Sequence, residues 1–385
     1  MSDGTADTNR DRGITFWVVG AILLLVMPVL NVLPPEDSWF HLSDFSLNRF
    51  GKFLAFAILA LGLDLIWGYT GILSLGQGVF FGLGAYCMGM HLMLTIGKES
   101  VYGSDMPDFM VWNQVKELPF FWKPFYSFPA AVIGALLVPM VVALIFGFFA
   151  FRSRIKGVYF AIITQALALA AWLVFNRNDT NLGGTNGLTD FKQVIGYRLS
   201  ESGTQRVLYV ITVLCLGASY LLCQWIIRSR AGRVLVAVRD SEKRVVFSGY
   251  TPANYKLFVF VVSAGLAGLA GLLYAPQVGI ITPAQIGVLP SLEMVIWVAV
   301  GGRASLAGAV LGAVSVNYGR SILTNYFPEL WPFILGGLFV LVVLLFPDGL
   351  IGIIRKGKSL LTRRKAGEGK PTMPDEKTVV PEGKH

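Results

Sequence analysis

The chain alternates between long apolar runs and shorter polar segments over its 385 residues. A helix needs about 20 consecutive apolar residues to cross the hydrocarbon core of a bilayer, and most of these runs approach that length. Ten hydrophobic elements are predicted, over residues 14–33, 51–68, 78–96, 128–151, 157–175, 206–227, 257–280, 288–302, 304–325 and 331–350. The pattern therefore predicts an all-α, polytopic membrane protein in which some helical elements are short or broken.

The composition argues against a soluble globular fold. Hydrophobic residues make up 54% of the sequence and charged residues only 14%, whereas a soluble domain carries about 25% charged residues. The first run, 14–33, is longer than the apolar core of a signal peptide and is not followed by an Ala-x-Ala site, so we expect a retained span. Cys87, Cys215 and Cys223 lie inside apolar runs without metal-ligand spacing and are expected to be small buried hydrophobic residues.

The net charge of +9 follows from how Lys and Arg are distributed among the loops. One alternate set of loops, which includes 228–256 and the C-terminal tail, holds most of these residues. Cytoplasmic loops of membrane proteins carry this excess, so both termini are predicted to be cytoplasmic and no nucleic-acid partner is expected. The predicted organisation is a cytoplasmic arm over 1–13, a transmembrane domain over 14–350 and a basic, disordered tail over 351–385.

Two elements are unusual for membrane helices. Residues 69–77 are polar and rich in glycine but link two apolar runs, and residues 288–302 are short for a span. In lipid, irregular backbone is tolerated only where it is buried in protein or lines a wet cavity, and broken helices often mark a transport pathway. Ordinary tight turns between helices are the alternative.

Small residues recur at helical spacing near both unusual elements. Gly78 pairs with Gly82, and Gly308 pairs with Gly312, four residues apart, as in membrane helices whose backbones approach closely. The runs 71–86 and 302–318 also resemble each other weakly, which suggests a duplicated fold. The glycines expected to be structural are Gly71, Gly76, Gly78, Gly82, Gly301 and Gly302.

Signatures of catalysis are absent or misleading. Residues 352–359 match the pattern of a phosphate-binding loop, but a membrane run precedes them and only a short tail follows, so the chain is expected to carry no ATPase. Asp64, Glu293 and Arg320 are charged residues inside predicted spans, and such residues are candidates for functional sites. Because the three histidines are dispersed, they cannot form a proton relay. We predict a transporter without bound metal.

The loop over 228–256 carries the strongest functional signal. Val234, Val238, Val245 and Phe247 are predicted to form the apolar side of two short helices that are broken near Asp240 and Ser241. Asp240 is expected to cap the second helix. A solvated charged loop is the alternative, but the apolar positions favour a docking surface.

At this loop the sequence resembles the branched-chain amino acid and urea permeases of ATP-binding-cassette (ABC) importers, of the LivM/UrtC type. The glycine-rich stretches 68–86 and 297–308 resemble two further segments of these permeases. The resemblance implies a loop that couples to an ATPase subunit. Its residues here would be Arg239, Asp240, Ser241, Glu242, Arg244 and Gly249.

The resemblance also implies the partners and the location. They are a homologous second permease subunit, two ATPase subunits that hold ATP and Mg, and a periplasmic solute-binding protein, at the bacterial inner membrane. No cofactor is expected on this chain itself.

The predicted outer segments 106–122 and 176–191 resemble the urea branch, so urea or another short-chain amide is the expected solute. A branched-chain amino acid subunit is the alternative within the class, and a passive channel or ion-coupled carrier is the alternative from another class. The candidate pathway residues are Ser74, Gln77, Gln165 and Glu293.

Overall fold

The computed structural model of the chain describes residues 26–33, 42–100, 102–153, 155, 157–330, 333–337, 340 and 349–352. The predicted arm over 1–13 lies outside these residues, as do most of the predicted tail and most of the first and last hydrophobic elements. The helices are α2 (Met27–Val32), α3 (Asp44–Thr70), α4 (Gln77–Ile96), α5 (Asp108–Trp112), α6 (Phe128–Arg152), α7 (Val158–Phe175), α8 (Ser202–Arg228), α9 (Arg230–Phe247), α10 (Pro252–Val278), α11 (Val288–Gly301) and α12 (Leu306–Tyr326).

Short 3₁₀ turns and one small hairpin complete the described part. The turns are η2 (Gly97–Glu99), η3 (Lys123–Tyr126), η4 (Asn178–Thr180), η5 (Gly184–Asn186), η6 (Pro283–Ile286) and η7 (Pro328–Leu330). Strands β1 (Gln193–Val194) and β2 (Tyr197–Arg198) form the antiparallel hairpin.

Seven helices of the described residues are long and apolar enough to cross a membrane, namely α3, α4, α6, α7, α8, α10 and α12. The predicted all-α polytopic membrane fold is thereby confirmed. Helix α11 is a shorter apolar helix of 14 residues, which agrees with the short element predicted there. Helix α3 begins earlier than its apolar run, because Ser43 accepts a hydrogen bond from the Ser46 amide and starts the helix in a polar segment.

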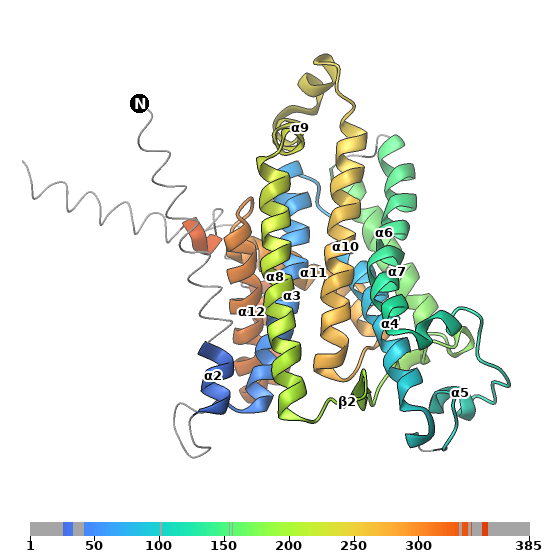
Figure 1. The fold of residues 1–385 in the computed structure, drawn as a ribbon. Coiled ribbons are helices and arrows are strands. Elements are labelled where there is room, and N and C mark those ends of the chain that lie inside the picture. The colour runs from blue at the N-terminus through green and yellow to red at the C-terminus, as the bar shows by residue number, and fades with distance from the viewer. Residues whose placement is uncertain are drawn as a thin grey trace, which may run out of the picture.

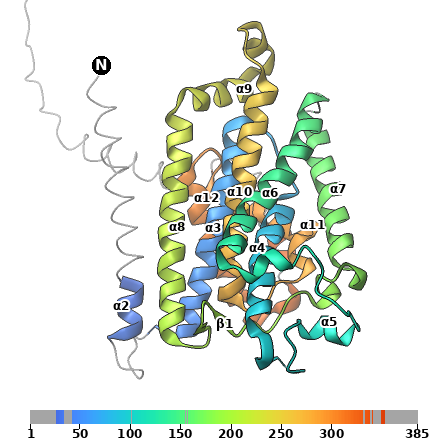
Figure 2. The same ribbon diagram turned by 45° about the vertical axis from the view of Figure 1, so that its right-hand side comes forward.

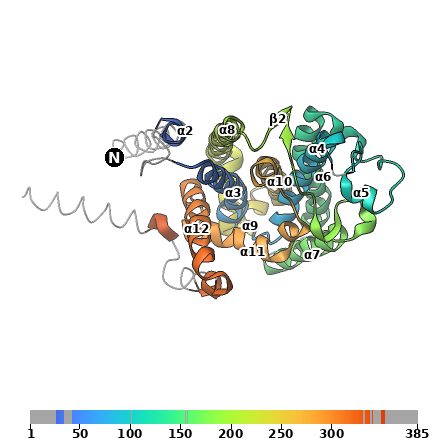
Figure 3. The ribbon, with the colours of Figure 1, turned by 90° about the horizontal axis from the view of Figure 1, so that it is seen from below.

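Helix α10 lies in the middle of the bundle. It packs against α3, α4 and α6, and the view from below shows it between these helices (Figure 3). Helices α3 and α4 are mostly buried, whereas only a small part of α6 and α7 is buried inside the bundle. Figures 1 and 2 show α9 at one end of the bundle, and α5 with the β hairpin at the other. The two ends therefore present different structures.

Glycines set the distance between neighbouring helices. A Cβ atom placed on Gly271 of α10 would lie 2.0 Å from the Phe81 carbonyl oxygen of α4. One placed on Gly312 of α12 would lie 2.0 Å from the Trp297 carbonyl oxygen of α11. Real Cβ atoms do not approach that closely, so these helix pairs pack backbone against backbone.

A single methyl group at Gly312 should separate α11 from α12. We expect Gly312→Ala to lower the free energy of unfolding by about 1–3 kcal/mol, the usual cost of overpacking. The matched control is Gly319→Ala on the same helix, where an added Cβ meets no atom within 4 Å. Because alanine favours the helix, the control should be neutral or stabilising. Thermal unfolding of the purified variants in detergent measures both, and equal melting temperatures would contradict the packing argument.

Candidate functional site

Helix α9 has two halves, with a break where the sequence predicted one. Ser241 has φ −163° and ψ 96°, outside the helical region. The first half starts at Ser229, whose hydroxyl accepts from the Gly232 amide. The second half is held by an ion pair of 2.8 Å between Glu242 and Lys256 of α10, whose side chain is 9% exposed. The ion pair joins the second half of α9 to a membrane helix.

The apolar side of α9 differs from the predicted one. Leu235, Val238 and Val245 are buried against the bundle. Phe247, predicted to share that side, is 89% exposed. The predicted capping residue Asp240 accepts instead from the Nε of Arg239 at 3.2 Å. The exposed surface of α9 therefore combines apolar and charged side chains, as a docking surface does.

A shallow groove of about 610 Å³ runs along this surface. It is lined by Arg230, Arg233, Val234, Ala237, Asp240, Arg244, Val245, Ser248, Tyr250 and Tyr255. Arginines outnumber the single carboxylate in this lining, so the groove is suited to an acidic surface.

Arg239 connects α9 to the end of α3. Its guanidinium Nη1 donates to the Gly68 carbonyl oxygen at 3.0 Å. Gly71 follows α3 with φ +74°, and a Cβ atom there would lie 3.1 Å from Cγ of Arg239. A glycine is required at this position both for its backbone angle and for the close approach of Arg239.

The turn between α11 and α12 contacts the same end of α3. The Ala304 amide donates to the fully buried carboxylate of Asp64 at 2.8 Å, and the Tyr69 hydroxyl donates to the Ala304 carbonyl at 3.1 Å. These bonds hold Ala304 at φ +56°, an uncommon angle for a residue with a Cβ atom.

Arg303 of the same turn lies over the Trp67 ring, 4.2 Å from the ring centroid. Partial burial lowers the pKa of the Arg303 guanidinium, an effect that Asp64 opposes and Arg239 reinforces. We refer to the contacts of the α3 end with Arg239 and with residues 303 and 304 as the α3 junction.

The segment 71–76 interrupts the membrane helices beside the α3 junction. The Leu75 amide donates to the Thr164 hydroxyl of α7 at 3.0 Å, and the Gly78 amide donates to the Ser291 hydroxyl of α11 at 3.1 Å. The side chains of Ser74 and Gln77 are at most 1% exposed, and within the described part of the chain their polar atoms have no hydrogen-bond partner. Unpaired polar groups at a helix break can serve a polar solute that passes there.

Sequence reasoning missed Thr164 and chose its neighbour, Gln165. The Gln165 side chain is partly exposed, and Thr164 is the residue of α7 that holds the interrupted segment. The sequence offered only one signal for Thr164, a hydroxyl group in an otherwise apolar helix. The role of such a hydroxyl depends on the segment that packs against it.

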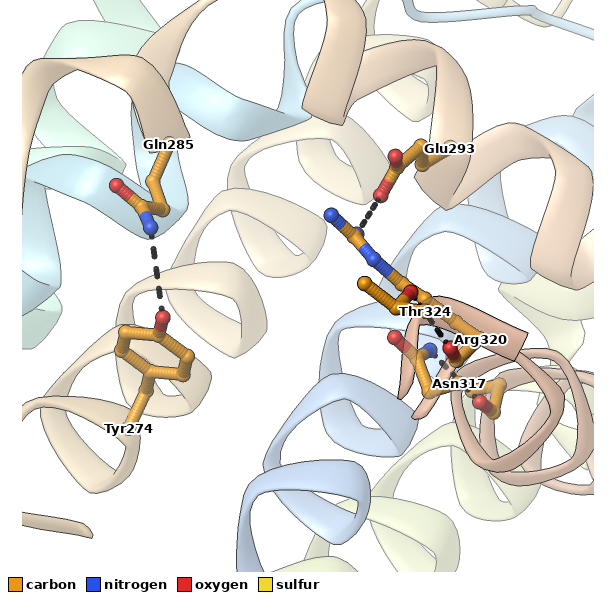
Figure 4. A network of polar contacts seen from close by, with 7 residues as sticks. Tyr274, Gln285, Glu293, Asn317, Arg320 and Thr324 are labelled. Atoms are coloured by element: carbon orange, nitrogen blue, oxygen red, sulfur yellow. Dashed lines mark hydrogen bonds and ion pairs between the residues drawn. The ribbon is translucent and has the colours of Figure 1, made fainter. Parts of the chain in front are cut away.

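Glu293 lies apart from Ser74 and Gln77, in an ion pair with Arg320. Its Oε2 accepts from Nη1 of Arg320 on α12 at 2.5 Å, and the side chains of Glu293 and Arg320 are 17% and 45% exposed. Figure 4 shows this ion pair together with the bond from Gln285 to the Tyr274 hydroxyl. Ser291 and Glu293 are two residues apart on α11 and thus point to opposite faces of the helix. These predicted pathway residues therefore fall into two separate polar sites. Ser74 and Gln77 lie on one side of α11, and Glu293 lies on the other.

Comparison with known proteins places these features in a family. Residues 46–343 match the family described as the permease component of the branched-chain amino acid transport system. The chain belongs to this family.

Individual relatives of this permease are distant but cover most of it. The high-affinity branched-chain amino acid transport system permease protein LivM of Salmonella typhimurium is 26% identical, over 90% of this chain and 78% of LivM. The corresponding protein BraD of Pseudomonas aeruginosa is 24% identical, over 77% of this chain and 91% of BraD. The LivH protein of Escherichia coli is 21% identical, over 77% and 91%. No solved structure matches the permease.

The hydroxyl of Thr164 should stabilise the interrupted segment 71–76. In Thr164→Val the partly buried Leu75 amide loses its acceptor, which should lower the free energy of unfolding by about 1–3 kcal/mol. In the control, Thr95→Val, the lost hydroxyl bonds mainly the Leu92 carbonyl of its own helix, at 2.8 Å. Thermal unfolding in detergent should separate the two variants. A Thr164→Val protein as stable as wild type would exclude this role.

Proposed function

We propose that this permease is one of two homologous membrane subunits of an ABC importer for branched-chain amino acids. The relatives named above are permeases of branched-chain amino acid transport, and they include both LivM and LivH. Their names favour the amino acid alternative over urea, whose support is the likeness of segments 106–122 and 176–191. We expect the second subunit to be a chain of the LivH kind.

The observation that carries the coupling role is the structure of α9. It lies at one end of the bundle, exposes Phe247 and a basic groove, and is joined to the membrane helices by buried contacts. A passive channel would not need such a surface. We assign α9 to the cytoplasmic side, where ATPase subunits that hold ATP and Mg dock on it.

The α3 junction offers a route from α9 to the membrane helices. Arg239 bonds the end of α3, and Asp64 of α3 bonds the turn that joins α11 to α12. When the ATPase subunits close, a shift of α9 would act on both interrupted elements, 71–76 and the short α11. Coupling requires that the ATP state favour one of two discrete arrangements of these helices. The periplasmic solute-binding protein would deliver solute at the opposite end, near α5 and the β hairpin.

Uptake measurements in cells test the substrate class. In cells without this permease, uptake of labelled L-leucine at micromolar concentration should be lost and should return when the gene is restored. Labelled urea is the matched probe, because it is small, polar and uncharged. Loss of urea uptake with leucine uptake unchanged would refute the amino acid assignment and support the urea reading.

The exposed ring of Phe247 should contact the ATPase subunit. Phe247→Ala should weaken the association by about tenfold, since a buried aromatic anchor commonly contributes 1–2 kcal/mol or more. Co-purification of the ATPase subunit with tagged permease, titrated with added ATPase, measures the change.

The matched control is Phe120→Ala, an 84% exposed phenylalanine at the opposite end of the bundle. It should leave the association unchanged. Equal affinities for wild type and Phe247→Ala would show that Phe247 is not part of the docking surface.

A further inference from the structure

Lys52 of α3 occupies an unusual position for a charged residue. It lies inside a membrane-spanning helix and is partly buried, with Nζ 5.8 Å from the ring centroid of Phe56 and 5.9 Å from that of Tyr274. The ion pairs of the described residues do not include Lys52. An ammonium group inside a membrane is costly, and such groups usually meet an opposite charge or water.

The charged residues near Lys52 come from two other helices. Glu293 of α11 and Arg320 of α12 act on it electrostatically, and they form the ion pair seen in Figure 4. Arg49, one turn before Lys52, donates to the Ser321 hydroxyl of α12 at 3.1 Å. Among the described residues, this group of four, the α3–α11–α12 charge cluster, contributes three cations and one carboxylate. It therefore favours an additional negative charge.

The charge cluster is accessible as well as charged. The Arg320 side chain is 45% exposed and that of Glu293 17%. Charged side chains at membrane depth face a water-filled path or a protein partner rather than lipid. The cluster is therefore open to the outside of this subunit rather than enclosed within it.

We propose that the charge cluster binds the backbone groups of a zwitterionic amino acid, with Lys52 holding the carboxylate and Glu293 the ammonium group. The inference rests on the proposed function and assigns the substrate class to this place. A carboxylate gives Lys52 the anionic partner that it lacks among the described ion pairs. An ionised Glu293 can accept several hydrogen bonds, so it can bind an ammonium group while remaining beside Arg320. Urea carries neither charge and would gain nothing from this arrangement.

The test uses the complete importer in proteoliposomes, with labelled L-leucine and saturating binding protein. Lys52→Met and Glu293→Gln should each lower the maximal uptake rate by about tenfold or more, because hydrogen bonds to charged groups contribute about 1.5–3 kcal/mol. The leucine concentration for half-maximal uptake should change little, since the binding protein captures the solute. The control Lys116→Met removes an exposed lysine from the loop after α5 and should transport at the wild-type rate.

A double variant separates substrate binding from a purely structural ion pair. Removing Glu293 alone leaves Arg320 without its partner, which could disturb folding. Glu293→Gln combined with Arg320→Gln restores the charge balance. If the cluster binds substrate, the double variant stays slow. Recovery of the wild-type rate would overturn the proposal.

Three other outcomes are distinct. If Lys52→Met loses the second permease subunit on purification, Lys52 belongs to a subunit contact and the proposal fails. If wild type imports leucine and both single variants do so at its rate, the inference fails but the proposed function remains. If the wild-type importer moves no leucine, the proposed function fails and the inference with it.

Discussion

The structure of this permease depends on finding hydrogen-bond partners for backbone groups that have none within their own helix. Lipid offers no hydrogen bonds, so each end of a broken helix must find a partner inside the protein. At the end of α3 the Gly68 carbonyl is bonded by Arg239, and the Ala304 amide by Asp64. The amide of Leu75 is bonded by Thr164. Every one of these partners comes from another element, and together they join α3, α7, α9 and the turn before α12 into one connected structure.

This arrangement connects α9, the proposed coupling surface, to the interrupted helices. The first half of α9 packs on the bundle through the buried side chains of Leu235 and Val238. The second half is joined to α10 by the ion pair of Glu242 and Lys256. These buried contacts fix how each half of α9 packs on the bundle. In the proposed mechanism, a movement of α9 is transmitted to the end of α3 through Arg239.

The sequence predicted the features that depend on local pattern, such as the spans and the helix break. It missed side-chain positions that depend on tertiary contacts. Apolar runs identified the long spans, and the short α11 and the break at Ser241 followed from length and composition. Phe247 was assigned to the same side as Val245, but the two residues are two positions apart in the second half of α9 and therefore point to opposite faces, so the burial of Val245 leaves Phe247 exposed. Thr164 could not be chosen over Gln165 from sequence, since only the packing of 71–76 against α7 distinguishes them. The orientation of the termini remains a prediction.

Helix α11 lies between the two polar sites of the membrane domain, the interrupted segment 71–76 and the ion pair of Glu293 and Arg320. One face presents Ser291 to the start of α4, and the opposite face presents Glu293 to Arg320 of α12. At its C-terminal end, α11 leads into the turn that Asp64 holds through Ala304. A helix of 14 residues held in this way cannot rotate or slide without changing both polar sites at once. The shortness of α11 is therefore as important as the charge of Glu293, because a full-length span would be fixed at both membrane surfaces, whereas this helix ends inside the protein.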